Sequence, residues 1–304
     1  MSHLPISDPD ILCQDVTVRF PGHTALDGIN LTLSGRGVVG LIGVNGAGKT
    51  TLINTILGIT QPTSGRVRVN AAGARSALCT DVPSFEPSFT ADEVLRQSVL
   101  LSDGRKAVPS RDERILVLDR VGLADAADRK TGGFSRGMRQ RLGIAAGIVS
   151  GPPIIFLDEP TSALDPLGRR MILDIIRDLA REMLVVVSSH ILDDVESVAS
   201  SLVVIHEGKL RFVGTLQDFL SPVRDHEDSV VIRFSGGWDE LREDLIGCAY
   251  RFEDDGSLVL PSSGLATALK YFARNPGDLE SVSLSRPGLA QAFFASVEAQ
   301  YVLA

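Results

Sequence analysis

The sequence is poor in cysteine and carries no excess of basic charge. Its cysteines are Cys13, Cys79 and Cys248, an odd and widely spaced set that predicts neither a disulfide framework nor a zinc cluster. Isolated reduced thiols are typical of cytosolic proteins. Lysine and arginine together number 30 against 38 acidic residues, for a formal net charge of −8. Because the basic residues are also scattered, a nucleic-acid surface is not expected.

Long apolar runs are missing as well. The most apolar stretch runs from Leu142 to Leu157, and Pro152 and Pro153 interrupt it. It falls short of the roughly 20 residues that a membrane span needs. The first ten residues, MSHLPISDPD, contain no basic segment followed by an apolar run, so no secretory signal is expected. If this protein works at a membrane, another chain must hold it there.

Strand and helix patterns alternate through most of the chain and predict an α/β fold. Near the N-terminus, ILCQDVTVRF and ALDGINLTLS flank the turn PGHT and predict antiparallel strands. The later expected elements are a strand at 38–43, a helix at 49–59, a strand at 66–70, a helix at 135–149, a strand at 154–158, a helix at 167–181, a strand at 183–189, a helix at 191–199 and a strand at 201–208. This order predicts a core with a mixed, mainly parallel sheet.

Two segments interrupt or follow that core. Residues 83–131 contain two helical patterns, and Thr90 with Glu93 forms a capping box, so a helical insertion is expected there. Ser221-Pro222 and the run RDHEDS at 224–229 predict a linker. The chain would therefore consist of an ATP-binding domain at 1–222 and a small α+β domain at 223–304. The second would have a β-α-β-β-α-β order plus a helix, which resembles a ferredoxin-like unit.

The string GVNGAGKT at 43–50 matches the phosphate-loop pattern G-x-x-x-x-G-K-[ST] at every required position. An apolar strand precedes it and a helical pattern follows it, which is the context that the pattern requires. Glycines allow the backbone N–H groups to surround an anion. Lys49 would then place its charge on the β- and γ-phosphates, and Thr50 would offer a hydroxyl to Mg²⁺.

A second motif, IIFLDEP at 154–160, ends an apolar strand with two carboxylates. Ligands of α/β folds bind at that edge of the sheet. Asp158 is suited to anchor Mg²⁺, and Glu159 points elsewhere and could polarise an attacking water. Alone, such an acidic pair is usually a surface turn, but behind a phosphate loop the catalytic interpretation is favoured.

With these motifs the chain resembles the ATP-binding cassette (ABC) ATPases, in particular the nucleotide-binding subunits of ABC exporters, over roughly residues 10–220. FSRGM at 134–138 is similar to the family signature, SALD at 162–165 to the D-loop, and His190 to the switch histidine. The motifs occur in the family's order. Their combination is far more specific than any one of them.

The resemblance implies an Mg²⁺-dependent ATPase that forms an ATP-sandwiched dimer of two cassettes, most simply a homodimer. Lys49, Glu159 and His190 would be catalytic, and Thr50 and Asp158 would bind the metal. The implied ATP-binding residues are Phe20, Gly43, Val44, Asn45, Gly46, Ala47, Gly48, Lys49, Thr50 and Thr51. Ser135, Arg136, Gly137 and Met138 would complete the partner's site, and Ser162 and Asp165 would belong to the D-loop. A separate membrane permease would hold the subunit in the cytoplasm at the inner face of the membrane.

The chain departs from the family pattern at two places. In the signature, Arg136 replaces a glycine and Met138 a glutamine. Arg136 adds bulk but also positive charge beside a polyphosphate, so the change is tolerable. Where the family has a glutamine before the helical insertion, the equivalent here is Asp81 in CTDVPSF. Asp81 is interpreted either as a metal ligand or coupling contact, or as a surface residue. Arg139 and Arg141 are expected to be solvated helix residues rather than catalytic ones.

Two rival functions remain open. A soluble ABC ATPase that acts on ribosomes or DNA usually carries tandem cassettes or coiled-coil insertions, whereas this chain shows one cassette and no heptads. A P-loop kinase or another NTPase would not need FSRGM and SALD. Neither the cargo nor the direction of transport is encoded in these motifs, although the C-terminal unit and the signature variant favour export. Its last segment, SLSRPGLAQAFFASV at 283–297, resembles the end of many exporter ATPases.

Overall fold

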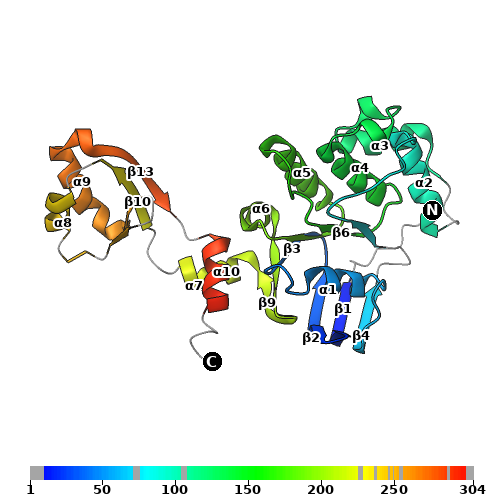
Figure 1. Cartoon of the computed structure of the whole chain (residues 1–304), viewed down its shortest axis with the longest axis horizontal. Helices are drawn as coiled ribbons and strands as arrows, with labels where there is room; N and C mark the ends of the chain where they lie inside the picture. The colour runs from blue at the N-terminus through cyan, green and yellow to red at the C-terminus, as the bar shows by residue number, and fades with distance from the viewer. Residues whose placement is uncertain are drawn as a thin grey trace, which may run out of the picture. The chain divides into compact units, whose positions relative to one another are not determined.

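The computed structural model divides into two compact units, Met1–Leu216 and Gln217–Ala304 (Figure 1). It describes residues 10–70, 76–103, 108–224, 229–235, 238–245, 247–248, 250–252, 256–285 and 288–298. None of the helices in this described part combines the length and the apolar character that crossing a membrane requires.

The centre of the first unit is a six-stranded sheet in the order β5-β6-β7-β3-β8-β9. Its strands are β3 (Gly37–Ile42), β5 (Ala77–Cys79), β6 (Ile154–Asp158), β7 (Leu184–Ser189), β8 (Ser201–His206) and β9 (Lys209–Thr215). All neighbours are parallel except β8 and β9. The predicted mainly parallel core is therefore confirmed, with β5 and β9 as additional edge strands.

A second, antiparallel sheet is built from the N-terminal strands in the order β2-β1-β4. It contains β1 (Asp10–Phe20), β2 (His23–Ser34) and β4 (Ser64–Asn70). Helix α1 (Lys49–Ile56) lies between this sheet and the central one (Figure 1). Its Leu52, Ile53 and Ile56 belong to one buried cluster with residues of both sheets. This packing holds the start of α1 firmly at the end of β3.

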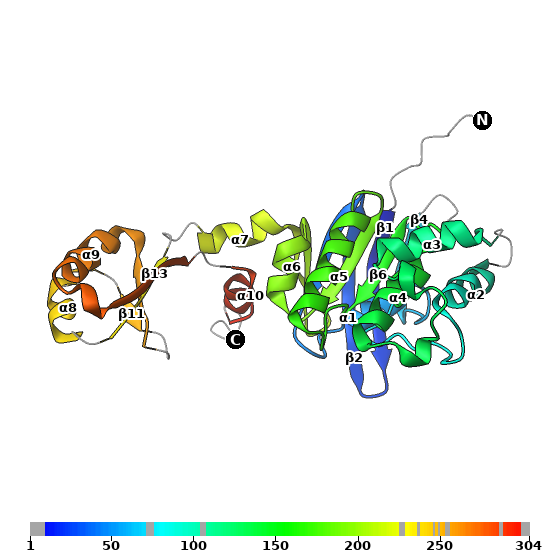
Figure 2. The same ribbon diagram turned by 90° about the horizontal axis from the view of Figure 1, so that it is seen from above.

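Helices α5 (Pro166–Leu179) and α6 (Leu192–Val198) cover the other face of the central sheet (Figures 1 and 2). Helix α1 ends three residues before the predicted end at Ile59. Gly58 has φ +73°, and a left-handed residue at this position stops a helix. The predicted strand and helix boundaries elsewhere in the core agree within a few residues.

The predicted helical insertion contains α2 (Ala91–Asp103) and α3 (Arg111–Arg120), and α4 (Arg136–Ile148) follows it. The capping box is confirmed, because Glu93 N donates to Thr90 Oγ1 and Thr90 N donates to the Glu93 carboxylate. A buried ion pair joins α2 to α3, with Arg114 Nε 2.7 Å from Asp92 Oδ1. Hydrogen bonding to Arg114 lowers the pKa of Asp92.

The second unit begins with α7 (Leu216–Arg224), where a linker was expected. Pro222 lies inside this helix. It has no N–H for the carbonyl of Asp218, and Ser221 Oγ donates to that oxygen instead. The unit boundary accordingly falls at 216, before the predicted 222. Residues 225–228 of the predicted linker lie outside the described residues.

The rest of this unit contains β10 (Ser229–Phe234), α8 (Trp238–Asp244), β11 (Arg251–Phe252), β12 (Leu258–Pro261), α9 (Leu265–Arg274), β13 (Leu279–Ser285) and α10 (Leu289–Glu298). The strands form an antiparallel sheet in the order β11-β12-β10-β13. Leu241 and Leu245, together with Tyr271 and Phe272 of α9, cover it in a separate core. Residues 254–255 of the expected hairpin lie outside the described residues.

Candidate nucleotide-binding site

The loop 43–48 joins the end of β3 to the start of α1, as predicted for a phosphate loop. Gly48 has φ +108°, and a Cβ there would lie 2.6 Å from the carbonyl oxygen of Ala25. Gly46 also has a positive φ, +80°. Only glycine adopts these conformations at little cost. The loop backbone is thus free of side chains where an anion would approach.

Lys49, the first residue of α1, is buried, with 7% of its surface exposed. Its Nζ donates to the carbonyl of Gly43 at 2.7 Å and lies 4.0 Å from Glu159 Oε1. Burial lowers the pKa of Lys49, and the charges of Glu159 and Asp158 oppose that shift. The amine is therefore held over the loop by contacts within this chain.

Thr50 and Asp158 meet at the edge of the central sheet. Thr50 Oγ1 donates to Asp158 Oδ2 at 3.1 Å, and the hydroxyl of Ser188 donates to the other carboxylate oxygen. Ser188 is fully buried at the end of β7. Its position after four apolar residues, next to the end of β6, is the signal that could have identified it from the sequence.

Glu159 lies one residue beyond β6 in the left-handed region, with φ +50°. A non-glycine residue there is uncommon and is typical of functional sites. Its N–H bonds the backbone carbonyl and the hydroxyl of Ser188, both at 3.1 Å. Its carboxylate oxygen lies 2.6 Å from His190 Nδ1. Three strand ends thus bring together Lys49, Glu159 and His190, the three predicted catalytic residues.

A cleft of about 370 Å³ opens beside these side chains. It is lined by Phe20, His23, Ala25, Asn45, Gly46, Ala47, Gly48, Lys49, Thr50, Thr51 and Glu159. Phe20 is 48% exposed, so it is not a core residue. The sequence did not single out His23 and Ala25, which sit at the start of β2. Gly43 and Val44 do not line the cleft, although their carbonyls accept hydrogen bonds from Lys49.

The predicted D-loop follows Glu159 directly. Ser162 N donates to the Glu159 carbonyl at 3.1 Å. Asp165 is the N-cap of α5, and its carboxylate accepts from Gly168 N at 2.7 Å. The turn is supported from below, since Thr161 Oγ1 donates to the buried carboxylate of Asp194 at 2.6 Å. Helix capping therefore already accounts for one oxygen of Asp165.

The signature residues form the exposed start of α4. Ser135 is the N-cap, and its hydroxyl accepts from Met138 N at 3.2 Å. A Cβ on Gly137 would come no closer than 3.8 Å to any neighbouring atom, the nearest being Leu164 Cδ2. Ser135 itself is exposed, so this turn leaves room for a ligand or a partner to approach.

Arg139 and Arg141 are helix residues as expected, but they are half-buried and hydrogen-bonded rather than fully solvated. Arg141 Nη1 donates to the carbonyls of Val121 and Gly122 at the end of α3, and burial lowers its pKa. Arg139 Nη1 donates to the Phe134 carbonyl at 2.5 Å. The Arg141 guanidinium therefore ties α4 to the end of α3, whereas the Arg139 guanidinium bonds the residue directly before the cap of its own helix. Helical spacing alone could not show the Arg141 contact, because its two acceptors belong to another part of the chain.

Asp81 lies in the connection between β5 and α2, where its carboxylate oxygen is 3.2 Å from Arg136 Nη2. Within the part of the chain that the structure describes, no group of three or more His, Cys, Asp or Glu side chains is placed to hold a metal. A two-oxygen set such as that of Thr50 and Asp158 falls below that size.

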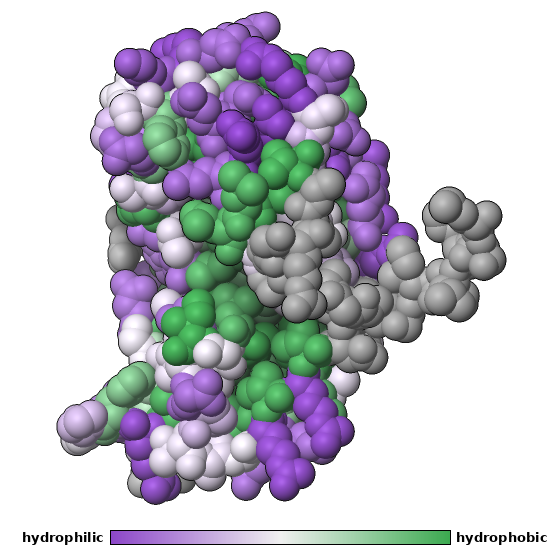
Figure 3. All heavy atoms as spheres, turned by 90° about the vertical axis from the view of Figure 1, so that its right-hand side faces the viewer, coloured by the Kyte–Doolittle hydropathy of each residue, from purple (hydrophilic) through white to green (hydrophobic). Residues whose placement is uncertain are grey.

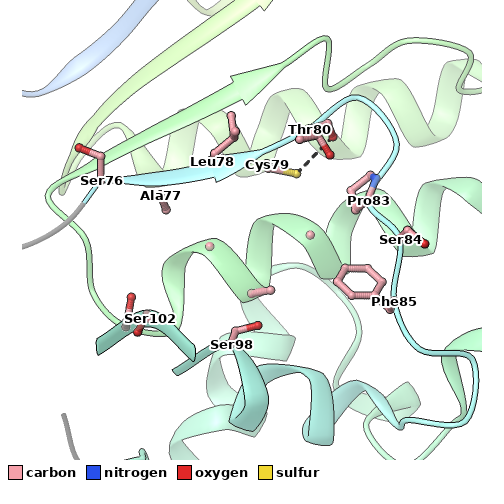
Figure 4. Close-up of a pocket in the computed structure, with 14 residues that line it drawn as sticks. Ser76, Ala77, Leu78, Cys79, Thr80, Pro83, Ser84, Phe85, Ser98 and Ser102 are labelled. Atoms are coloured by element: carbon pink, nitrogen blue, oxygen red, sulfur yellow. Dashed lines mark hydrogen bonds between the residues drawn. The ribbon is translucent and has the colours of Figure 1, made fainter. Parts of the chain in front are cut away.

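The same connection borders a second hollow, of about 450 Å³, which Figure 4 shows. It lies between β5, the residues after it, α2 and α4. Its walls consist of Ser76, Ala77, Leu78, Cys79, Thr80, Pro83, Ser84, Phe85, Ser98, Ser102, Gly143, Ala146, Gly147 and Ser150. We call it the β5 groove. Small residues make up most of its walls, and the pKa of Cys79 is raised to about 12 by burial.

Comparison with known proteins agrees with this geometry. The profile of the family described as "ABC transporter" matches residues 26–162. The chain is 32% identical over 244 residues to the uncharacterized ABC transporter ATP-binding protein YxlF of Bacillus subtilis, covering 79% of this chain and 82% of the relative. It is 32% identical to the Nod factor export ATP-binding protein I of Burkholderia pseudomallei, covering 90% and 96%.

An import protein is similar too. The methionine import ATP-binding protein MetN of Caulobacter vibrioides is 35% identical over 71% of this chain and 70% of its own length. Among solved structures, an ATP-binding subunit of an ABC transporter superposes with a TM-score of 0.61 and 26% identity, over 78% of this chain and 99% of the other. With the phosphate loop, the strand carboxylates and the signature turn in place, the chain belongs to the ABC transporter family and is the ATP-binding subunit of an ABC transporter, an ATPase coupled to transport.

Proposed function

We propose that this protein binds Mg²⁺-ATP between two copies of itself and powers a separate membrane permease, with export as the direction. The observation that carries the proposal is the bonded set of side chains at the strand ends together with an exposed signature turn. One copy supplies the phosphate loop and the other supplies Ser135 and Gly137. Because each copy offers both surfaces, the pairing is two-fold symmetric.

Hydrolysis requires positioning and charge neutralisation more than covalent chemistry. Lys49 faces the loop that would hold the phosphates, and the loop N–H groups and the start of α1 add positive potential. Thr50 and Asp158 present two oxygen ligands 3.1 Å apart, a donor set that suits Mg²⁺. When bound, Mg²⁺ neutralises charge on the phosphates. Ser188 keeps the Asp158 carboxylate turned toward that site.

Glu159 would orient the attacking water, because among the residues that line the cleft it alone carries a carboxylate. Its partner His190 lies on the next strand end, 2.6 Å away. His190 would report the γ-phosphate and hold Glu159 in place. Phe20, half exposed at the cleft, would stack on the adenine. ATP binding joins the copies and hydrolysis separates them, which gives a two-state element that can move a partner.

The β5 groove is the surface that we assign to the permease. Leu100 and Leu101 of α2 are 52% and 79% exposed, and Val82 beside the groove is 55% exposed. Figure 3 views the side on which α2 lies in Figure 1, and apolar residues form a band down it. Small wall residues such as Ala146 and Ser150 leave space for an inserted segment. This contact would place the protein in the cytoplasm at the inner face of the membrane.

Support for export comes from the extent of similarity. The alignment with the Nod factor export protein covers 90% of this chain, more than the first unit holds, so it extends into the second unit. The alignment with the methionine import protein covers 71% of this chain. We further propose that residues 217–304 form a ferredoxin-like domain, since the order of elements and the sheet order β11-β12-β10-β13 suit that arrangement.

The test is Glu159→Gln, which keeps the shape of the side chain but removes its charge. ATP turnover should fall about 100-fold or more, and gel filtration with saturating Mg²⁺-ATP should show a dimer. Glu280→Gln, the same change at an exposed position of β13, should leave both the ATP turnover and the apparent mass in gel filtration equal to those of the parent. A Glu159→Gln variant that stays monomeric would contradict the dimer. Co-purification with ribosomes rather than with an integral membrane protein would contradict the transport role.

A further inference from the structure

The two places where this chain departs from the family pattern contact each other. Asp81 replaces the expected glutamine, and Arg136 replaces a signature glycine. They are separated by 55 positions in the sequence, and Arg136 Nη2 lies 3.2 Å from Asp81 Oδ1. A glycine at 136 would leave Asp81 without this cation. The two departures are therefore partners in one ion pair, which their separate places in the sequence did not indicate.

Asp81 sits between the β5 groove and the start of α4. Thr80 and Pro83, on either side of it, line the groove. The same helix contacts this segment again, since Gln140 Nε2 lies 3.4 Å from the Thr80 carbonyl. At Gly143 a Cβ would lie 2.6 Å from Pro83 Cγ. Segment 80–83 therefore contacts α4 at several points. Among the described residues, only the Asp81–Arg136 pair in this contact joins two charged groups.

The pair is exposed enough for Arg136 to leave Asp81 and bind another anion. The Arg136 side chain is 38% exposed and that of Asp81 45%, so water and salt screen their attraction and it contributes little to stability. Arg136 directly follows the cap residue Ser135, at the end of α4 that faces the second copy's nucleotide in the proposed dimer. A guanidinium binds a phosphate through two parallel hydrogen bonds, and the phosphate carries more charge than one carboxylate.

We infer that Arg136 is a nucleotide-sensing residue that exchanges partners: it pairs with Asp81 in the separated subunit and with the γ-phosphate on the partner subunit in the closed dimer. This inference rests on the proposed function. Asp81 competes with ATP for Arg136, so it restrains dimer formation. When the dimer closes, the segment 80–83 loses its charged tie to α4, and the wall of the β5 groove is released at the moment when ATP is bound.

The experiment uses the full chain in the Glu159→Gln background and measures the ATP concentration that gives half-maximal dimer by light scattering. Asp81→Asn should lower this concentration about threefold, because it frees Arg136. Arg136→Gly should raise it about tenfold, because the phosphate loses a cation. The double variant should match Arg136→Gly alone, since Asp81 has nothing left to restrain. Arg136→Lys should fall between Arg136→Gly and the parent.

Several outcomes would overturn the inference. A rise on Asp81→Asn would favour a metal-ligand role for Asp81. Equal shifts on Asp81→Asn with and without Arg136 would show that the two residues act independently. An unchanged Arg136→Gly variant would remove Arg136 from the site. A Glu159→Gln parent that remains monomeric would overturn the proposed dimer as well, and this failure is visible before any second substitution is made.

Discussion

The phosphate-loop end of the sheet and the signature turn differ in how much of their geometry one chain fixes. At the first, Lys49 is buried, and hydrogen bonds link Thr50 to Asp158 and Glu159 to His190. At the second, Ser135 is exposed, and among the described residues its hydroxyl bonds only its own helix. In the proposed dimer, one half of the site is preorganised by its own fold, and the other half would meet a nucleotide only when a second subunit arrives.

The largest effect should come from breaking the preorganised half. Lys49→Ala removes the only amine held over the loop by described contacts, so ATP turnover should fall about 100-fold or more. Steady-state phosphate release and binding of a fluorescent ATP analogue measure the loss. Lys270→Ala, at an exposed position of α9, is the matched control and should behave as the parent. Turnover within threefold of the parent in Lys49→Ala would refute the assigned role.

A smaller effect is expected from Ser188, which positions other groups. Ser188→Ala removes the hydrogen bond that the hydroxyl donates to Asp158 and the one that it accepts from Glu159 N. Turnover should fall about 10- to 100-fold, and the Mg²⁺ concentration needed for half-maximal activity should rise. Ser188→Thr keeps the hydroxyl and should recover part of the activity. If the Mg²⁺ requirement does not move, Ser188 serves packing alone.

The role of Ser135 in the signature turn can be tested by comparing two helix caps. Ser135 caps α4, and Ser110 caps α3 through a complete capping box. Either serine replaced by alanine should cost about 1 kcal/mol of unfolding free energy, measured by urea denaturation. Only Ser135→Ala should also reduce ATP turnover, by about tenfold. Equal turnover in both variants would mean that Ser135 is a cap and nothing more.

The motifs could be predicted from the sequence because each is local. Loop 43–50 is recognised by the spacing of its glycines. Strand 154–158 is recognised by an apolar run that ends in an acidic residue. What could not be predicted depends on pairing across the fold. Ser188 gains its role only because β7 lies beside β6. Likewise, the partner of Asp81 is set by how α4 packs, which no spacing encodes.

Predictions from local sequence were wrong where a neighbouring group in the fold changed the outcome. Pro222 favours a linker, yet α7 continues through it because Ser221 Oγ takes over the Asp218 carbonyl. Strand β9 was missed although its residues alternate strictly between exposed and half-buried positions, which is the pattern of a strand with one partly covered face. Arg141 was expected in solvent because a guanidinium on a helix usually is, whereas the end of α3 offers it two carbonyls.

The smallest predicted effect concerns the base rather than the phosphates. Phe20 is 48% exposed at the cleft, and stacking of an aromatic ring on a base contributes about 1 kcal/mol. Phe20→Ala should therefore weaken binding of ATP and ADP alike, about fivefold, and leave the maximal turnover near that of the parent. Phe20→Trp should preserve affinity and supply a fluorescence signal that nucleotide quenches. Because Phe252 is similarly exposed, at 45%, but lies in the second unit, Phe252→Ala is the control. A change in maximal turnover without a change in affinity would place Phe20 in the chemistry and remove it from adenine binding.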